Sequence, residues 1–185
     1  EIQAEESNEG ETIMKKKMLA VFICLVMVAG LIPTVAFAAE NEVDVWDGTS
    51  DTSWYNETDT EFHIKTAEQL AGLAELTNIG IDTGASTGNT FENKIIYLDC
   101  DLDLGDYPWT PITNRNVDDG YFFKGTFDGQ GHTIYNLNRH GIGNDSFDSL
   151  FGYVQGGVIK NLNVVDADLS ANDYSMHVGI IAALV

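Results

Sequence analysis

The chain has 185 residues, with 29 Asp and Glu against 9 Lys and Arg, and a formal net charge of −20 at pH 7. A chain this acidic repels the phosphates of nucleic acids and of anionic membranes, which excludes both as partners. Its two cysteines exclude a disulfide-rich scaffold, so the stability of the fold must come from a packed core.

Residues 1–38 are not expected to belong to the fold. Residues 1–13 are acidic and precede Met14, and we interpret them as an upstream, non-native segment. Residues 14–38 have the pattern of a Sec signal peptide, with three lysines, an apolar run over residues 18–32 and the cleavage pattern Ala36-Phe37-Ala38. The apolar run is shorter than the ~20 residues of a membrane-spanning helix. We therefore expect bacterial secretion, cleavage after Ala38, and no membrane insertion after cleavage.

The chain after Ala38 begins with a polar N-terminal segment and a helix. Residues 39–65 are polar and end in a short predicted strand at Phe62-His63-Ile64. Residues 66–78 are predicted to form a helix, because Thr66 is a good N-cap and Gln69 completes a capping box. The helix is amphipathic, so we expect it to cap the open end of the following domain. Its predicted apolar face consists of Leu70, Leu73 and Leu76.

Residues 79–185 are predicted to form the coils of a solenoid. Residues 94–104 alternate between apolar and acidic side chains, as a strand does, and short β-rich runs separated by Gly and Asn follow from Phe123. The sequence Ile-x-Asn-Leu-Asn occurs at residues 134–138 and again at 159–163. This 25-residue offset is typical of a stacked repeat. We therefore predict a mainly β fold, an incomplete right-handed parallel β-helix truncated at its C-terminal end.

Asn136 and Asn161 are the predicted corner residues of this repeat. Asparagine tolerates the left-handed backbone conformation that such a turn needs. We expect the two residues to lie one coil apart and their amides to hydrogen-bond along the stack. The same offset predicts two further stacked pairs, Ile134 with Ile159 and Leu137 with Leu162, and a looser repeat predicts a third, Phe151 with Ile181.

Two sets of residues are candidates for a special role. Asp99, Asp101 and Asp103 lie on one face of the predicted strand, where they could hold a calcium ion or form a solvated face. Calcium is the one cofactor that the sequence suggests. The second set consists of glycines at predicted turns or close contacts, namely Gly129, Gly131, Gly152 and Gly157.

Seven sequence pieces occur in order along nearly the whole chain after the signal peptide. They are residues 46–49, 66–74, 102–104, 109–112, 123–134, 150–152 and 157–162. Together they resemble the GLUG-motif proteins, bacterial secreted and cell-surface proteins of β-helical type. The chain departs from that pattern at Ala182-Ala183, where a further glycine is expected. The resemblance implies an extracellular, adhesin-like role and no catalytic site.

The predicted function is a non-catalytic secreted or cell-surface module that binds an extracellular glycan or a host or cell-surface protein. No HExxH motif occurs. Two alternatives stay open. A polysaccharide-active β-helix enzyme, a lyase or hydrolase, would need cations beside its acids, and only Arg115 and Arg139 supply guanidinium groups. The chain could also be the N-terminal module of a large secreted peptidase.

Overall fold

The computed structural model describes residues 43–79, 88–114, 122–139, 147–169 and 177–185. All of them belong to one compact unit, Val43–Val185. Predictions for residues 1–42 lie outside the described residues. The elements are β1 Glu61–Ile64, α2 Ala67–Asn78, β2 Ile95–Leu98, β3 Leu102–Asp103, β4 Thr126–Asp128, β5 Thr133–Tyr135, β6 Phe147–Asp148, β7 Phe151–Tyr153, β8 Val158–Lys160, β9 Asn163–Val165, β10 His177–Val178 and β11 Ala182–Leu184.

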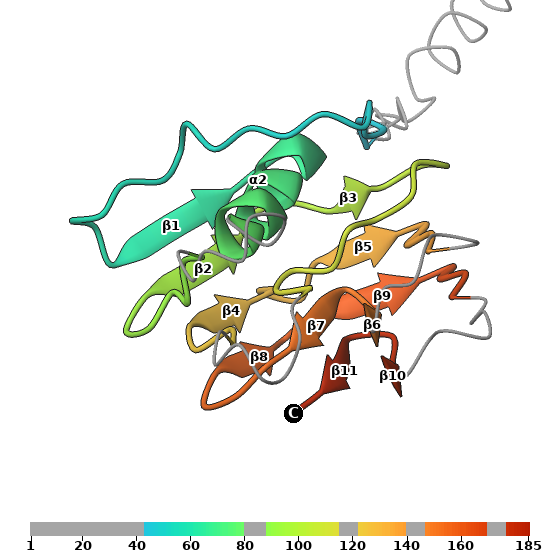
Figure 1. Ribbon diagram of the computed structural model, residues 1–185. Coiled ribbons are helices and arrows are strands. Elements are labelled where there is room, and N and C mark those ends of the chain that lie inside the picture. The colour runs from blue at the N-terminus through green and yellow to red at the C-terminus, as the bar shows by residue number, and fades with distance from the viewer. Residues whose placement is uncertain (1–42, 80–87, 115–121, 140–146, 170–176) are drawn as a thin grey trace, which may run out of the picture. The chain divides into compact units, whose positions relative to one another are not determined.

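The strands stack in parallel as a β-solenoid of about three turns (Figure 1). The first sheet has the order β1-β2-β4-β8, and the second has the order β3-β5-β9. Two-stranded sheets, β6 with β10 and β7 with β11, form the remaining side. The predicted fold class, a mainly β solenoid with one short helix, is therefore confirmed.

The register of the sheets shows that the coils are longer than the predicted 25 residues. In the first sheet the stacked inward positions are Phe62, Ile96, Phe127 and Ile159. In the second sheet they are Leu102, Ile134 and Val164. The predicted 25-residue coil is therefore wrong, although the solenoid that it suggested is present.

Asn136 and Asn161 lie at different corners of the solenoid, which explains the error. The Asn136 N–H donates to Val165 O at 3.1 Å, so Asn136 lies beside the end of β9. Asn161 lies beside Gly129, whose N–H donates to Lys160 O at 2.9 Å. Both asparagines have a left-handed backbone, with φ of 57° and 53°, as predicted. The same short sequence serves two different corners, so its offset is not the coil length.

The other pairs predicted to stack are also wrong. Ile134 stacks on Leu102 and Val164 rather than on Ile159. The Leu137 carbonyl accepts from Asp168 N–H, whereas Leu162 lies against Gly129. Phe151 pairs with Ala182, next to the predicted Ile181.

The predicted strand over residues 94–104 is two strands separated by a corner. Strand β2 ends at Leu98 and β3 begins at Leu102. The inward residues of both strands are buried, whereas Cys100 at the corner is only partly buried. Alternation of apolar and acidic residues continues through the bend, so the pattern alone does not show where the chain turns.

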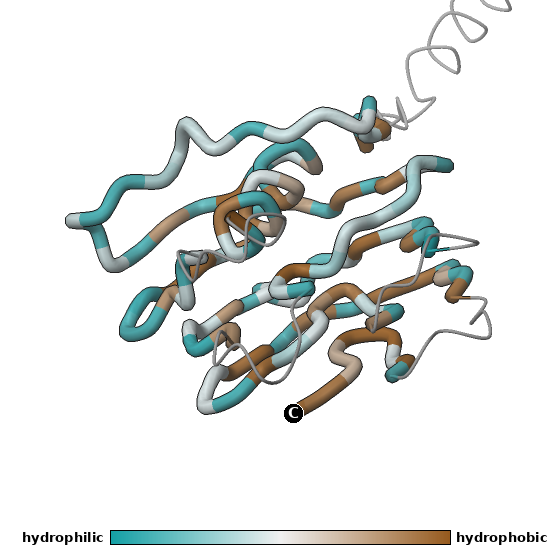
Figure 2. The backbone as a smooth tube through the Cα atoms, viewed as in Figure 1, coloured by the Kyte–Doolittle hydropathy of each residue, from teal (hydrophilic) through white to brown (hydrophobic). Residues whose placement is uncertain are grey.

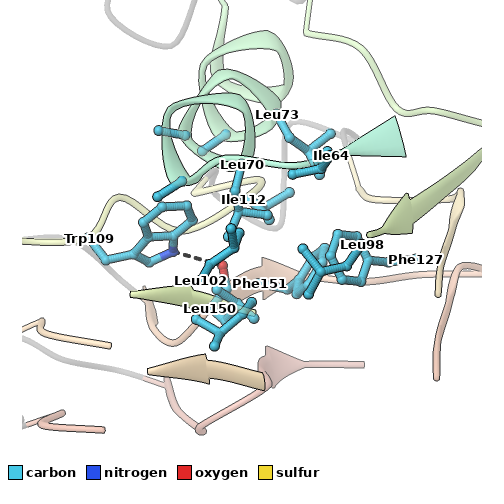
Figure 3. Close-up of a cluster of buried hydrophobic side chains, with 14 of the residues drawn as sticks. Ile64, Leu70, Leu73, Leu98, Leu102, Trp109, Ile112, Phe127, Leu150 and Phe151 are labelled. Atoms are coloured by element: carbon cyan, nitrogen blue, oxygen red, sulfur yellow. Dashed lines mark hydrogen bonds between the residues drawn. The ribbon is translucent and has the colours of Figure 1, made fainter. Parts of the chain in front are cut away.

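The helix forms as predicted. The Thr66 side chain accepts a hydrogen bond from Gln69 N–H. The Gln69 side chain accepts one from Lys65 N–H at 2.9 Å, whereas in the usual capping box the donor is the N–H of the N-cap residue, here Thr66. Leu70 and Leu73 are fully buried, while Leu76 is partly buried. Figure 3 shows Leu70 and Leu73 above the side chains of the first coils.

The helix end and the N-terminal segment cap the first coil. Thr113 N–H donates to the Thr77 hydroxyl at 2.9 Å, and the Asn78 side chain donates to Pro111 O at 2.9 Å. Val45 forms a parallel bridge with Asp103 at the edge of the second sheet. In Figure 1, α2 lies at the same end of the stack as β1. The predicted capping role of the helix is thus supported by its contacts.

The four predicted glycines are required for two different reasons. A Cβ at Gly129 would lie 2.5 Å from Asn161 O, one at Gly152 would lie 2.3 Å from Thr113 O, and one at Gly157 would lie 2.7 Å from Phe123 O. These three glycines allow the backbones of adjacent coils to approach. Gly131 differs, because it has open space around it and a φ of +89°.

This difference predicts unequal effects of alanine at two of these glycines. Gly152→Ala forces adjacent coils apart and is expected to lower the free energy of unfolding by more than about 2 kcal/mol. Gly131→Ala meets no atom within 4 Å and is expected to cost only about 1–2 kcal/mol for its left-handed backbone. Urea unfolding of both variants measures the loss in the free energy of unfolding that each alanine causes. A larger loss for Gly131→Ala would contradict the packing explanation.

Candidate functional site

The richest group of polar side chains lies where the chain turns from the first sheet to the second. We call this the first corner. It consists of residues 99–101, 128–132 and 161–163, which include the connections from β2 to β3, β4 to β5 and β8 to β9. Because the chain bends at this place in three successive coils, side chains about one coil apart in sequence meet there. These residues come together only with the strand register that is observed in the sheets.

Asp128 and Asn161 form one rung between two coils. The Asn161 amide donates to Asp128 Oδ1 at 3.0 Å, and the Lys160 ammonium lies 3.1 Å from Asp128 Oδ2. The Gln130 N–H also donates to Asp128 Oδ1, at 3.0 Å. The side chain of Asp128 is therefore held in one orientation by residues of its own coil and of the next.

A second rung of the same kind lies at a different corner. The Asn136 amide donates to Asp103 Oδ1 at 2.8 Å, and this pair is separated by 33 residues, as are Asp128 and Asn161. The predicted hydrogen bond between the two corner asparagines is wrong, because they lie at different corners. Each of them donates instead to an aspartate of the preceding coil.

Two histidines lie against aspartates of the first corner. His63 Nδ1 lies 2.8 Å from Asp99 Oδ1, and the Gln130 amide donates to the same oxygen at 3.0 Å. His132 Nδ1 lies 3.0 Å from Asp101 Oδ1. Both imidazoles remain partly exposed, with side-chain exposures of 53% and 34%.

Asp99, Asp101 and Asp103 therefore have separate partners. Asp99 contacts His63, Asp101 contacts His132, and Asp103 contacts Asn136. Among the described residues, no group of three or more His, Cys, Asp or Glu side chains is placed to hold a metal ion. The calcium site stays a prediction, with no converging ligand set behind it in the described part of the chain.

An open polar depression of about 630 Å³ lies at the part of the first corner formed by the later coils. The Asn163 amide donates to Gly131 O at 2.8 Å and fixes the side of the depression. Left-handed backbone at Gln130 and Asn161, with φ of 52° and 53°, turns the chain at two levels. The depression is lined by Asp128, Gln130, Gly131, Asn161, Leu162 and Asn163.

Hydrogen bonds hold the corner carboxylates in their ionised form. The Asn161 amide, followed by the Gln130 N–H, lowers the pKa of Asp128. The Thr133 N–H, with help from His132, lowers the pKa of Asp101 against the opposing effect of burial. Burial is the largest single influence on Asp99 and raises its pKa, but His63, Gln130 and Lys65 together outweigh it and leave the pKa lowered.

These lowered pKa values predict a loss of stability in acid. A carboxylate with a depressed pKa in the folded state stabilises the fold fully above its ordinary value, 3.8 for aspartate, and this contribution is lost as the pH falls through the folded pKa. We expect the melting temperature to fall as the pH is lowered below about 4. Asp128→Asn should shrink the acid-induced fall, and an unchanged fall in that variant would contradict a role for this rung.

A smaller cavity of about 260 Å³ lies between α2 and the N-terminal segment. Trp46, Trp109 and Glu75 are among its lining residues. Both indoles are almost fully buried, and Glu75 hydrogen-bonds Ser50, which also lines the cavity. It is smaller than the depression and is lined in part by these two buried indoles, so it is the weaker candidate.

Sequence reasoning identified the turn at residues 128–132 but not the depression. It assigned Gly129 and Gly131 a structural role, which the close contact and the left-handed φ support. It missed Gln130 and Asn163, because the 25-residue offset did not bring β4, β5 and β9 to one corner. The available signal was the 33-residue spacing shared by the Asp103–Asn136 and Asp128–Asn161 pairs.

No protein-family model, curated protein or solved structure matches the chain. The resemblance to GLUG-motif proteins therefore rests on the seven sequence pieces alone. Within the described residues, no helix is long and apolar enough to cross a membrane.

Proposed function

We propose that this protein is a secreted or cell-surface module that binds carbohydrate at the first corner and catalyses no reaction. The depression carries the proposal, because it is lined by one carboxylate and the amides of Gln130, Asn161 and Asn163. Carboxylate and amide groups can accept from and donate to several sugar hydroxyls at once. The solenoid supports the proposal, since it holds these side chains on a rigid, preformed surface.

The charge of the corner favours a neutral or amino sugar as the ligand. Asp99, Asp101 and Asp128 all have lowered pKa values and are ionised at neutral pH. Lys160 lies beside the depression, and its ammonium already contacts Asp128. A uronic acid or a sulfated glycan would meet like charge here, which disfavours it.

Binding can be measured by calorimetry with neutral, amino and acidic oligosaccharides. Asn163→Ala and Gln130→Ala each remove a side chain that lines the depression, and losing one hydrogen bond of about 0.5–1.5 kcal/mol should weaken binding roughly 3- to 10-fold. Asn138→Ala is the matched control, since its amide donates to Asp106 O away from the depression. Equal losses in all three variants, or binding of acidic glycans only, would count against the proposed site.

Secretion is a separate part of the proposal. The pattern over residues 14–38 supports a cleavable signal peptide. Expression in a bacterial host with a Sec pathway should give secreted protein whose N-terminal sequence reads Ala39-Glu40-Asn41. Material that still begins at Met14 in the culture medium would contradict this expectation.

A polysaccharide-active enzyme is the second candidate, favoured by the two His–Asp pairs of the first corner. A carboxylate beside an imidazole can orient it as a general base. Mass spectrometry of digests of pectin, alginate and host glycans should show no new products if the protein only binds. A reproducible unsaturated product that disappears in Asp101→Asn would establish the enzyme instead.

A further inference from the structure

The cavity between α2 and the N-terminal segment has a buried apolar floor and an exposed rim. Trp46 and Trp109 are at most 7% exposed, and Ala71 and Ala74 of α2 are also buried. Figure 2 shows the N-terminal segment beside α2 in hydrophilic and neutral colours, whereas the helix contains hydrophobic stretches. The volume of about 260 Å³ lies just below the ~300–1,000 Å³ of ordinary ligand pockets, so the cavity suits a small molecule. The rim residues are Gly48, Thr49, Ser50, Glu75, Pro108 and Thr110.

The floor offers a ligand carbon surface and no free side-chain donor. Trp46 Nε1–H donates to Thr49 O at 2.7 Å, and Trp109 Nε1–H donates to Leu150 O at 3.1 Å. Figure 3 shows the second of these bonds, with the Trp109 indole beside α2. Both indole N–H groups are therefore already used, and the alanines carry no polar side-chain atom. The part of a ligand that reaches the floor must be apolar, because a polar group would lose its water partners there.

Two hydroxyl groups of the rim have already donated their protons. Thr49 Oγ1 donates to Asp47 Oδ1 at 2.6 Å, and Ser50 Oγ donates to Glu75 Oε2. Each hydroxyl carries a single proton, so both groups can now only accept a hydrogen bond. The Asn78 side chain, which also lines the cavity, is occupied as both donor and acceptor by backbone groups of another loop.

Glu75 is the one charged side chain among the described residues that line the cavity. Its Oε2 accepts from Ser50, whereas in the described part of the chain Oε1 has no donor and the carboxylate has no cation partner. A carboxylate can only accept hydrogen bonds. The net charge of −20 also attracts cations to the chain as a whole. The free capacity of the rim is therefore mainly acceptor capacity beside a negative charge that no side chain balances.

We propose that this cavity binds a small organic amine, with its ammonium group at Glu75 and a compact apolar body on the floor. An ammonium has three N–H donors and no acceptor, so it matches a rim whose free groups accept. An amino sugar fits poorly, because its hydroxyls would be desolvated against the apolar floor. A carboxylic acid would meet the like charge of Glu75. The amine site is separate from the carbohydrate site of the first corner.

Calorimetry of the purified full chain with phenethylamine and phenethyl alcohol tests the chemistry of the ligand, because the two compounds differ only in their polar head. We expect a dissociation constant of roughly 0.1–1 mM for the amine, and binding weaker by at least about tenfold for the alcohol. Nα-acetyl-lysine amide represents a lysine of a peptide and should bind more weakly than phenethylamine, since its stem covers less of the floor. Equal affinities for the amine and the alcohol, tighter binding of the lysine compound, or no binding of the amine would each overturn the proposal.

Two variants of α2 locate the ammonium. Glu75→Gln removes the charge, while its side-chain carbonyl can still accept from Ser50. This variant should bind phenethylamine at least about tenfold more weakly and phenethyl alcohol unchanged. Glu68→Gln is the matched control, because it removes the same charge about two turns earlier on the helix, and Glu68 does not line the cavity. Its affinity for the amine should equal that of the unmodified chain. An unchanged affinity for the amine in Glu75→Gln would overturn the proposal.

Nuclear magnetic resonance titration with phenethylamine separates this cavity from the first corner. The indole N–H signal of Trp46 should shift, because this side chain lines the cavity. The side-chain amide signals of Gln130 and Asn163, which line the depression, should not. Shifts at Gln130 and Asn163 in place of Trp46 would mean that the amine binds among the carboxylates of the first corner, which would also overturn the proposal.

Discussion

Replacing Leu73 with alanine is expected to lower the free energy of unfolding by about 2–5 kcal/mol. Leu73 is fully buried on the inner face of α2, in the same cluster as Leu70 and Ile64. Truncation removes its contacts and leaves a cavity that the surrounding strands can fill only partly. At this chain length, a loss of about 3 kcal/mol corresponds to a fall of roughly 6–12 °C in melting temperature.

Glu75→Ala is the matched control on the same helix. Glu75 is exposed, and its hydrogen bond with Ser50 lies at the surface. Surface changes of this kind usually stay within about 0.5 kcal/mol. Calorimetric melting of both variants compares the two faces of the helix. If both variants melted close to the unmodified protein, the helix would not be an integral cap of the first coil.

Replacing Arg139 with methionine is expected to cost about 3–5 kcal/mol of stability. Arg139 Nε lies 3.1 Å from Asp148 Oδ1, and both side chains are at most 5% exposed. Nε also donates to Phe147 O, and Nη1 donates to Trp109 O at 2.9 Å. Methionine fills much of the volume but removes the positive charge that balances the buried carboxylate.

The double variant Arg139→Met/Asp148→Leu distinguishes the effect of an unbalanced buried charge from the effect of a changed side-chain shape. A buried ion pair replaced as a whole by apolar residues often costs little. We therefore expect the double variant to be more stable than Arg139→Met alone, with a coupling energy of about 0.5–3 kcal/mol in a double-mutant cycle followed by urea unfolding. Additive losses in the cycle would show that the two side chains act independently.

The sequence was sufficient to predict the solenoid, the helix and the corner conformation, because each depends on local chemistry. Thr66 and Gln69 determine where the helix begins, and Asn136 and Asn161 adopt the left-handed backbone that asparagine tolerates. The short β-rich runs cannot build long sandwich strands. These features follow from neighbouring residues and need no knowledge of which coil lies beside which.

The register of the coils could not be predicted in the same way. The corner after β5 and the corner after β8 both need a left-handed residue followed by an inward leucine, so the chain repeats one sequence at two places in the stack. The 25-residue offset between these two copies of the sequence is therefore not the length of a coil. The Asp–Asn rungs, such as Asp128 with Asn161, join residues a full coil apart, 33 positions along the chain. For the same reason, the depression beside Asn163 was not predicted.

The proposed binding site depends on the observed register of the coils, because only this register brings Gln130 and Asn163 to one corner. Scalar couplings through hydrogen bonds, measured by nuclear magnetic resonance on the labelled protein, test the register directly. The Asn136 amide nitrogen should couple to the Val165 carbonyl carbon, and the Gly129 amide nitrogen should couple to that of Lys160, since these N–H groups donate to those carbonyls at 3.1 and 2.9 Å. A coupling from the Asn136 amide to the carbonyl of Lys160 or Asn161 would restore the 25-residue coil and contradict the site.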